Sequence, residues 1–354
     1  MKSIQIFILF LLCSIAVKAQ ITVDNTVTPI DAMQTLLGDN VTISNLNYVG
    51  NATQIGVFDC IDCGLDFNNG IIISTGDVAT AVGPNDQGGA GTSFVNGPLS
   101  NSDLDFISPT PDNYFDIAIL EFDFVALGDS VWFEYIWASE EYHFYTVEDG
   151  PFDVFGLLIS GPDINGAYSD NAENIALVPT TGEGVSNVTI NNGQQNTGPC
   201  YNCEYLVSNG EGQIGEPQTT DVTVVQYDAY TTGLVASQGN LTCGETYHLK
   251  LIIADVQDGI FDSAIILKAG SLSSNLSVGV ELQIEATNQE GVMNEECGVS
   301  ELIFTRPESI STNIPFTVNI VYSGVAVNGV DYSALPEVIV FDPGVDVISF
   351  TLDA

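Results

Sequence analysis

The stretch Gly70-Ile71-Ile72-Ile73-Ser74-Thr75-Gly76 is a short apolar run bounded by glycines, which is the pattern of a buried β-strand. Further strand-like segments recur along the chain, and Gly, Asn, Asp and Pro turns separate them. The expected strands cover residues 41–46, 115–125, 130–138, 152–160, 175–179, 222–227, 246–254 and 263–269. Many short strands separated by turn residues predict an all-β fold, either a jelly roll or a β-sandwich.

One short helix is predicted near the start of the chain. Thr28 is a candidate N-cap, Pro29 suits the first helical position, and Asp31 falls at the third. Gly38 can end the helix. Its apolar stripe consists of Ile30, Met33, Leu36 and Leu37.

The composition shifts over residues 271–280, where a Ser-rich segment follows the last strand of the first block. We therefore expect a first β-sandwich domain over residues 20–274 and a second, smaller β-sandwich over residues 275–354. Strand-like segments continue at 278–286, 299–305, 314–322, 338–340 and 347–352. The final strand reaches Ala354 without a closing element, so we expect the second domain to be incomplete at its C-terminus.

The first residues have the pattern of an export signal. Lys2 is followed by an apolar run over residues 4–12, which 15–17 continue, and Val17-Lys18-Ala19 has the small-x-small form of a cleavage site. The run is shorter than the ~20 residues of a membrane-spanning helix, and no other run is long enough. We expect a signal peptide over 1–19 and a secreted, extracellular or cell-surface chain without direct membrane insertion.

The charge is strongly acidic. Forty-six Asp and Glu residues face five Lys and Arg residues, giving a net charge of −41. Nucleic acid is not an expected partner, because a phosphate backbone requires clustered cations. Hydrophobic residues still make up 45% of the chain, which is enough to build a core. Solubility in a salty medium and bound divalent cations both explain the acidity, and charge alone does not separate them.

Six cysteines lie outside the expected signal peptide, and an even number in an exported chain indicates disulfides. Four of them form two CxxC pairs in Gly-, Asn- and Asp-rich surroundings. A zinc site is the weaker interpretation, because the pairs lie far apart and no histidine is beside either. The sequence predicts two local disulfides, Cys60–Cys63 and Cys200–Cys203. The states of Cys243 and Cys297 are left open.

Three acidic clusters lie at the ends of expected strands: residues 139–143 follow one, 148–153 begin the next, and 255–262 lie between two others. Calcium binds six to eight oxygen ligands from loops of this kind. Neighbouring carboxylates repel unless a cation or a proton lies between them. The alternative is that they are solvated turn aspartates. The spacing is not that of an EF-hand. The candidate calcium ligands are Glu140, Glu141, Asp153, Asp255, Asp258 and Asp262.

Sequence motifs for catalysis are absent. The chain has two histidines, His143 and His248, and neither G-x-S-x-G nor H-E-x-x-H occurs. We therefore do not expect an enzyme. Two alternatives stay open. Glu140 or Glu141 with an aspartate of the third cluster could form a glycosidase-like pair in a secreted hydrolase. A calcium-dependent carbohydrate-binding lectin would use aromatic residues near the acids, namely Tyr135, Trp137, Tyr142, Phe144 and Tyr145.

Several segments resemble, in order, the choice-of-anchor L domain family. They lie at residues 115–124, 138–142, 153–162, 174–179, 243–250 and 253–264, and the resemblance spans about residues 21–272. Members are secreted bacterial proteins whose C-terminal sorting anchors differ. The resemblance implies surface display through a C-terminal anchor that is not present in this chain. It implies no established activity.

The tail resembles a Calx-beta domain, most clearly in Val327-Asn328-Gly329-Val330-Asp331-Tyr332. Residues 294–295, 304–307 and 317–318 also fit that pattern. Calx-beta domains are β-sandwiches, some of which bind calcium and occur in adhesins. Together these observations predict a calcium-stabilised adhesion or binding module. Its extracellular ligand is unknown, and a glycan and a surface protein are both expected classes.

Overall fold

The computed structural model describes residues 21–38, 41–60, 64–86, 88–94, 97–108, 113–146, 151–210, 225–274, 279–284, 299–306, 315–320, 322 and 325–353. The chain divides into two compact units. The first comprises Met1–Leu127 and Val131–Ser273, and the second comprises Gly128–Ser130 and Ser274–Ala354. The expected signal peptide lies outside the described residues.

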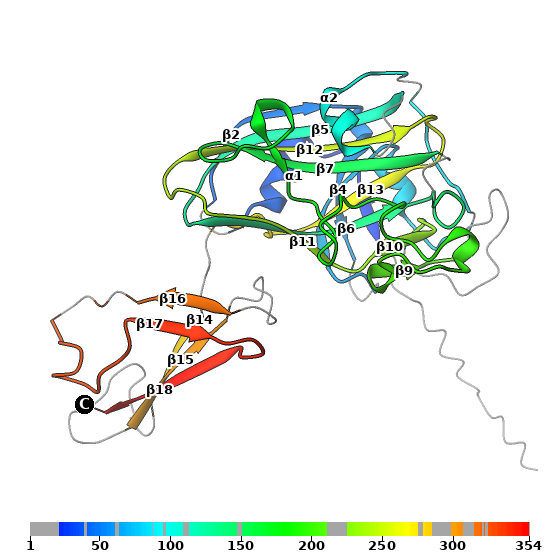
Figure 1. The fold of residues 1–354 in the computed structure, drawn as a ribbon. Coiled ribbons are helices and arrows are strands. Elements are labelled where there is room, and N and C mark those ends of the chain that lie inside the picture. The colour runs from blue at the N-terminus through cyan, green and yellow to red at the C-terminus, as the bar shows by residue number, and fades with distance from the viewer. Residues whose placement is uncertain are drawn as a thin grey trace, which may run out of the picture. The chain divides into compact units, whose positions relative to one another are not determined.

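The first unit is a sandwich of two antiparallel sheets (Figure 1). One sheet has the order β1 (Thr22–Asp24), β3 (Ile55–Asp59), β4 (Asn69–Ser74), β13 (Ser263–Lys268), β6 (Ser130–Ser139), β10 (Ala229–Thr231) and β9 (Leu206–Ser208), and β11 (Leu234–Gly239) pairs with β6. The other has the order β2 (Ile43–Val49), β5 (Tyr114–Val125), β12 (Thr246–Val256), β7 (Phe152–Ser160) and β8 (Glu173–Asn174). The predicted all-β sandwich is confirmed.

The main core lies between the two sheets and contains large aromatic side chains. Phe155 on β7 stacks on Trp137 of β6, with ring centroids 6.2 Å apart, and lies 5.6 Å from the Tyr135 ring. All three side chains are completely buried. Successive strand residues point to opposite faces, so the row of inward residues on each strand decides what fills this interior.

The predicted helix is confirmed as α1 (Pro29–Leu36), with the side chain of Thr28 accepting a hydrogen bond from the Asp31 amide. Its buried residues Met33 and Leu36 belong to the main core. The helix ends at Leu36 with Leu37 as its C-cap, so Gly38 lies just beyond the helix end. Gly38 instead permits a close approach, because a Cβ there would lie 2.7 Å from the Leu272 carbonyl oxygen.

A second helix, α2 (Ser102–Ile107), covers part of the outer face of β7. Ile107 packs over Gly156, where a Cβ would lie 2.5 Å from the Ile107 Cδ1 atom. The strand β7 is therefore buried on both faces along its whole length. This helix is not expected from the sequence, because residues 83–112 are rich in Gly, Asn, Asp, Ser and Pro and predict a long polar loop. The short 3₁₀ helices are Ala52–Gln54, Val78–Ala81, Ser169–Asn171, Gln194–Asn196 and Cys203–Tyr205.

Two predicted strands differ from the structure. Residues 175–179 follow β8 but do not form a strand. The Val178 amide donates a hydrogen bond to the Glu183 carbonyl oxygen, which forms a turn here. Residues 225–227 are also irregular, and 222–224 lie outside the described residues. Each segment forms one isolated β-bridge, Leu177 with Gly184 and Val225 with Val82, and neither belongs to a strand of the two sheets. Both segments are apolar because they are buried, as Val178 and Val225 are.

The second unit contains a sheet of β14 (Gly279–Ile284), β15 (Val299–Thr305) and β18 (Val347–Asp353), and a pair of β16 (Phe316–Asn319) and β17 (Val338–Phe341). Phe304, Ile339 and Phe341 form its buried core. The Arg306 guanidinium lies 5.6 Å from the centre of the Phe341 ring and donates to the Phe341 carbonyl oxygen. The likeness to a Calx-beta domain stays a sequence-based prediction.

Candidate functional site

The interior of the sandwich changes from apolar to acidic at one end of β7 and β12. On β7 the inward row runs from Phe155 to Asp153, and on β12 it runs from Ile253 to Asp255. Asp153 and Asp255 are direct cross-strand neighbours. Because opposite residues on adjacent strands lie about 5 Å apart at Cβ, the two carboxyl groups are side by side.

The other sheet brings further acids to the same place. After β6 the chain turns through Glu140 and Glu141, and the Glu140 amide donates to the Asp262 carbonyl oxygen at 3.0 Å. Asp262 precedes β13, and the hydroxyl of the next residue, Ser263, donates to Asp153 Oδ2. The structure therefore brings together residues from all three acidic clusters that the sequence singled out.

These acids are buried to an unusual degree. Five of the six predicted ligands are at most 3% exposed, and Asp258 is partly exposed. Each of the five has one buried carboxylate oxygen that has no hydrogen-bond partner among the described residues: Glu140 Oε1, Glu141 Oε2, Asp153 Oδ1, Asp255 Oδ1 and Asp262 Oδ2. Burying an unpaired charge is costly, so these oxygens require a proton or a cation.

Burial also determines the protonation of this site. Desolvation raises the pKa of Glu140 and Glu141 well above the usual range, and the neighbouring Asp228 and Asp153 add to these two shifts. The pKa values of Asp153 and Asp255 are raised in the same way by burial. Desolvation raises the pKa of Asp262 to about 8. Without a cation, protons therefore neutralise much of the site.

Two acids at this site were missed by sequence reasoning. Asp228 is 1% exposed, and its pKa is raised to about 7, chiefly by burial. Asp116 on β5 is equally buried. Neither belongs to an acidic run, so no local pattern marks them. We use the term acidic centre for Asp116, Glu140, Glu141, Asp153, Asp228, Asp255, Asp258 and Asp262.

Backbone amides of residues 88–94 approach the acidic centre. The Gly89 amide donates to both Glu140 Oε2 and Asp228 Oδ2, each at 3.2 Å. The Thr92 amide donates to Asp262 Oδ1 at 2.9 Å. Gly76 leaves room for the same carboxylate, because a Cβ there would lie 1.9 Å from Asp262 Oδ2. Residues 88–94 of the predicted polar loop therefore contact these acids through uncharged backbone amides.

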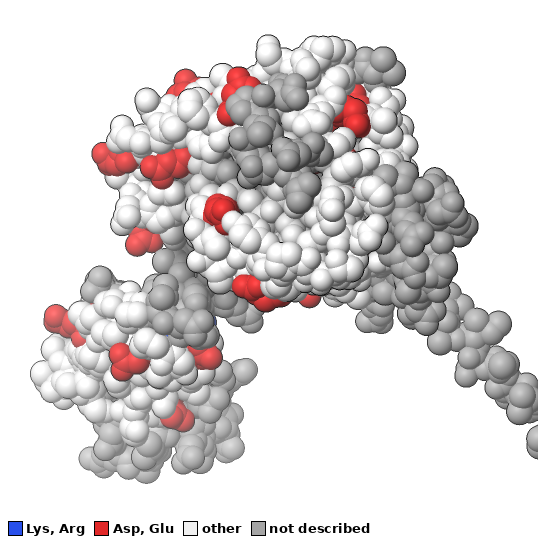
Figure 2. Space-filling view, turned by 45° about the vertical axis from the view of Figure 1, so that its right-hand side comes forward, with Lys and Arg blue, Asp and Glu red and all other residues white. Residues whose placement is uncertain are grey.

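No described Lys or Arg forms an ion pair with the acidic centre. Lys250 pairs with Asp103 at 3.2 Å, Lys268 pairs with Glu134 at 2.7 Å, and Arg306 lies in the second unit. On the face drawn in Figure 2, acidic side chains form separate spots, and the described residues there show no gathered patch of Lys or Arg. Neutralisation must therefore come from outside the described chain.

The two histidines have different surroundings. His143 is 1% exposed, its Nε2 lies 2.9 Å from the Ser208 hydroxyl, and burial lowers its pKa to about 4. Its side chain is therefore neutral at pH 7. His248 lies on β12 with Nδ1 2.7 Å from Asp123.

The donor set of the acidic centre fits a hard cation, since all of its side chains offer carboxylate oxygens. Within the described ranges, no three or more His, Cys, Asp or Glu side chains already stand in a metal-binding arrangement. Coordination of one ion would therefore require some of these carboxylates to rotate toward it.

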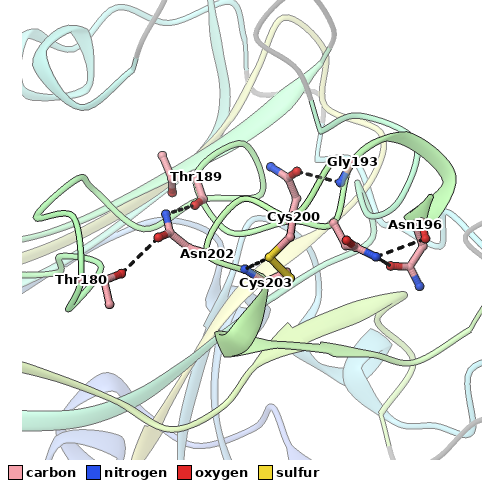
Figure 3. Close-up of a disulfide and its surroundings, with 9 residues drawn as sticks. Thr180, Thr189, Gly193, Asn196, Cys200, Asn202 and Cys203 are labelled. Atoms are coloured by element: carbon pink, nitrogen blue, oxygen red, sulfur yellow. Dashed lines mark hydrogen bonds between the residues drawn. A yellow bond between two sulfur atoms is a disulfide. The ribbon is translucent and has the colours of Figure 1, made fainter. Parts of the chain in front are cut away.

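The structure shows the disulfide or thiol state of four cysteines. Cys200 and Cys203 form a disulfide, as predicted, and the Cys203 amide lies 3.3 Å from the Cys200 sulfur (Figure 3). Cys60 is also disulfide-bonded, while its predicted partner Cys63 lies outside the described residues, as does Cys297. Cys243 is a free, exposed thiol.

The chain was compared with known proteins. The family model for the choice-of-anchor L domain matches residues 20–273. No curated protein and no solved structure matches the chain. In the part of the chain that the structure describes, no helix has the length and apolarity to span a membrane.

Proposed function

Because the chain belongs to the choice-of-anchor L domain family, we propose that it is an adhesion or binding module whose first unit is stabilised by calcium. Family membership indicates a surface-anchored bacterial protein, which is extracellular or attached at the cell surface. The role in binding and the calcium ion are the parts that we add. We propose Glu140, Glu141, Asp153, Asp255, Asp258 and Asp262 as the ligand set.

The observation that supports the calcium is the set of five unpartnered carboxylate oxygens in side chains at most 3% exposed. A carboxylate in such surroundings needs a positive partner or a proton. Oxygen-only donors favour a hard cation over zinc or copper, which prefer nitrogen and sulfur. Calcium tolerates irregular coordination, which suits ligands from two strands and two turns.

A calcium ion in the acidic centre would act as a staple rather than as a catalyst. The ligands come from the turn after β6, from β7, from the end of β12 and from the turn before β13. An ion held among them would join the two sheets at the end where the core is acidic. The proposed role is therefore to keep the first unit folded outside the cell.

Thermal unfolding tests the calcium proposal. An ion that binds only the native state raises stability by about 2.7 kcal/mol at a hundredfold excess over Kd, which corresponds to a rise in Tm of about 5–10 °C. We expect this rise with calcium relative to EGTA, and a smaller one with magnesium. Equal Tm values in calcium and EGTA, with no calcium retained on the dialysed protein, would refute the calcium part.

Bead adhesion tests the binding role. Beads coated with the chain should be retained on a mucin-coated surface in calcium. Albumin-coated beads serve as the control for passive attachment. Retention no greater than that of albumin-coated beads, on mucin and on extracellular-matrix protein alike, contradicts an adhesive role without touching the thermal result.

A further inference from the structure

An open cavity separate from the acidic centre lies against the outer face of β7. Its volume is about 800 Å³, within the range of small-molecule sites. Val154 forms part of its floor and belongs to the apolar cluster on the outer face of the sheet. Asp153, the preceding residue, points to the opposite face, so the cavity and the acidic centre lie on either side of one strand.

The rim of this cavity is held in place by the chain itself. Asn191 and Tyr201 exchange two backbone hydrogen bonds of 2.8 Å, and the Asn202 side chain donates to the Thr189 carbonyl oxygen at 2.8 Å (Figure 3). The Cys200–Cys203 disulfide closes the turn beside these bonds. A rim that is already ordered loses little conformational entropy when a ligand binds.

Two exposed aromatic rings line the cavity. Phe106 from α2 is 61% exposed, and Tyr201 from the rim is 43% exposed. Ile107 and Val154 add further apolar surface to the cavity lining. Exposed aromatic rings at a site offer flat apolar faces, against which the C–H face of a sugar ring can pack.

The polar groups of the cavity suit a ligand rich in hydroxyls. Within the described part of the chain, Thr146 Oγ1 has no hydrogen-bond partner, although Thr146 is only 5% exposed, and Glu183 Oε2 has none either. The Tyr201 hydroxyl donates to Glu183 Oε1 at 2.7 Å and so orients the carboxylate. Sugar hydroxyls both donate and accept, so a ligand rich in hydroxyls can offer partners to Thr146 and to Glu183.

The charge of the cavity limits the ligand class. Glu183 is the one charged side chain among the described residues that line it. A carboxylate with no cation beside it disfavours sulfated, sialylated or phosphorylated ligands. We propose that this cavity binds a neutral oligosaccharide, with Phe106 and Tyr201 as stacking residues and Glu183 as a hydroxyl acceptor. This rests on the proposed binding role, but not on calcium.

A glycan array tests the proposal directly. The probe is a printed array of neutral gluco-, galacto- and manno-oligosaccharides together with sialylated and sulfated ones. We expect neutral glycans to bind, and calorimetry with the best of them should give a Kd at least tenfold weaker for Phe106→Ala and for Tyr201→Ala. Glu183→Gln should weaken binding as well, because the neutral amide is a poorer acceptor.

Val49→Ala is the matched control, since Val49 is an exposed apolar residue on the edge strand β2 and lies outside the cavity lining. It should bind with the wild-type Kd. Should Tyr201→Ala unfold, Phe106→Ala decides, because Phe106 is mostly exposed and its loss should leave the fold intact.

Three results overturn the proposal: no neutral glycan binds, only acidic glycans bind, or Phe106→Ala binds as tightly as the wild type. Capture of peptides from a parallel peptide array, with no glycan bound, likewise overturns it. The thermal test is independent. A protein that binds glycan but gains no stability from calcium loses the calcium proposal alone, and the reverse result removes the glycan site alone.

Discussion

Asp153 on β7 and Asp255 on β12 lie directly opposite each other, and both carboxyl groups point between the two sheets. Like charges at opposite positions of a sheet destabilise it, and burial at 1% and 3% exposure strengthens the repulsion. The stability of this end of the sandwich therefore depends on whether protons or cations neutralise the two groups.

Asp255→Asn should have opposite effects with and without calcium. In EGTA the substitution removes one of two facing carboxylates, which should stabilise the fold by about 0.5–1 kcal/mol and raise Tm by about 1–4 °C. In calcium it removes a ligand, so the rise in Tm caused by calcium should shrink or disappear. Differential scanning calorimetry in the two buffers measures both effects.

Asp103→Asn is the matched control for a buried aspartate. Asp103 is 3% exposed, but its carboxylate accepts from Ser169 and pairs with Lys250 at 3.2 Å. Removing its charge leaves Lys250 without this partner, so Tm should fall equally in calcium and EGTA. A loss of the calcium effect in this variant would mean that the acidic centre is not what responds to calcium.

The stability of the protein in EGTA should fall as pH rises from about 6.5 to 8. Asp262, with a pKa raised to about 8, and Asp228, with a pKa raised to about 7, keep protons in the folded state that the unfolded chain has already released. The folded state then binds more protons, so the free energy of unfolding decreases with pH. Urea titrations at several pH values measure this slope.

His143 acts in the opposite direction, but only below about pH 6.5, where its contribution offsets part of the decline caused by the acids. Its pKa is lowered to about 4, so between about 4 and 6.5 the unfolded chain binds one more proton and stability rises with pH. Above pH 6.5 His143 no longer changes the stability with pH, so the decline between pH 6.5 and 8 tests the acidic centre alone. With calcium present, the ion replaces the protons of the acidic centre, so the decline should vanish. A parallel decline in both buffers would contradict calcium binding there.

The architecture could be predicted from sequence because strand patterning is local. Residues 152–160 and 246–254 were recognised as strands, and the helix cap at Thr28 was read from three neighbouring residues. α2 was missed, because six residues inside a polar loop carry too few apolar positions for a helical period. The prediction of a strand at 175–179 was wrong because buried chain that belongs to no sheet also has an apolar sequence.

The candidate site could be predicted only where acids cluster in the sequence. Glu140 and Glu141 are adjacent, and Asp255, Asp258 and Asp262 follow one another closely, so local reading found them. Asp116 and Asp228 are single acids in strand-like or irregular segments. They reach the acidic centre through the pairing of β5 with β12 and through hydrogen bonds from the amides of residues 88–94. These are long-range features that no short sequence motif encodes.

Phe155→Ala should strongly destabilise the first unit. Phe155 is fully buried, stacks on Trp137 and packs against Tyr135, so truncation leaves a cavity between the sheets. We expect a loss of about 3–5 kcal/mol in the free energy of unfolding, measured by urea denaturation in calcium. A loss below 1 kcal/mol would contradict the described packing of this core.

Gly76→Ala should uncouple calcium from stability while keeping the sandwich folded. The new Cβ would lie 1.9 Å from Asp262 Oδ2, so the carboxylate must move away from the other acids. We expect about 1–3 kcal/mol of destabilisation and a calcium-induced rise in Tm less than half that of the wild type. Gly239→Ala is the control, because a Cβ there meets nothing within 4 Å and should leave the calcium effect unchanged. A full calcium effect in Gly76→Ala would exclude Asp262 from the ligand set.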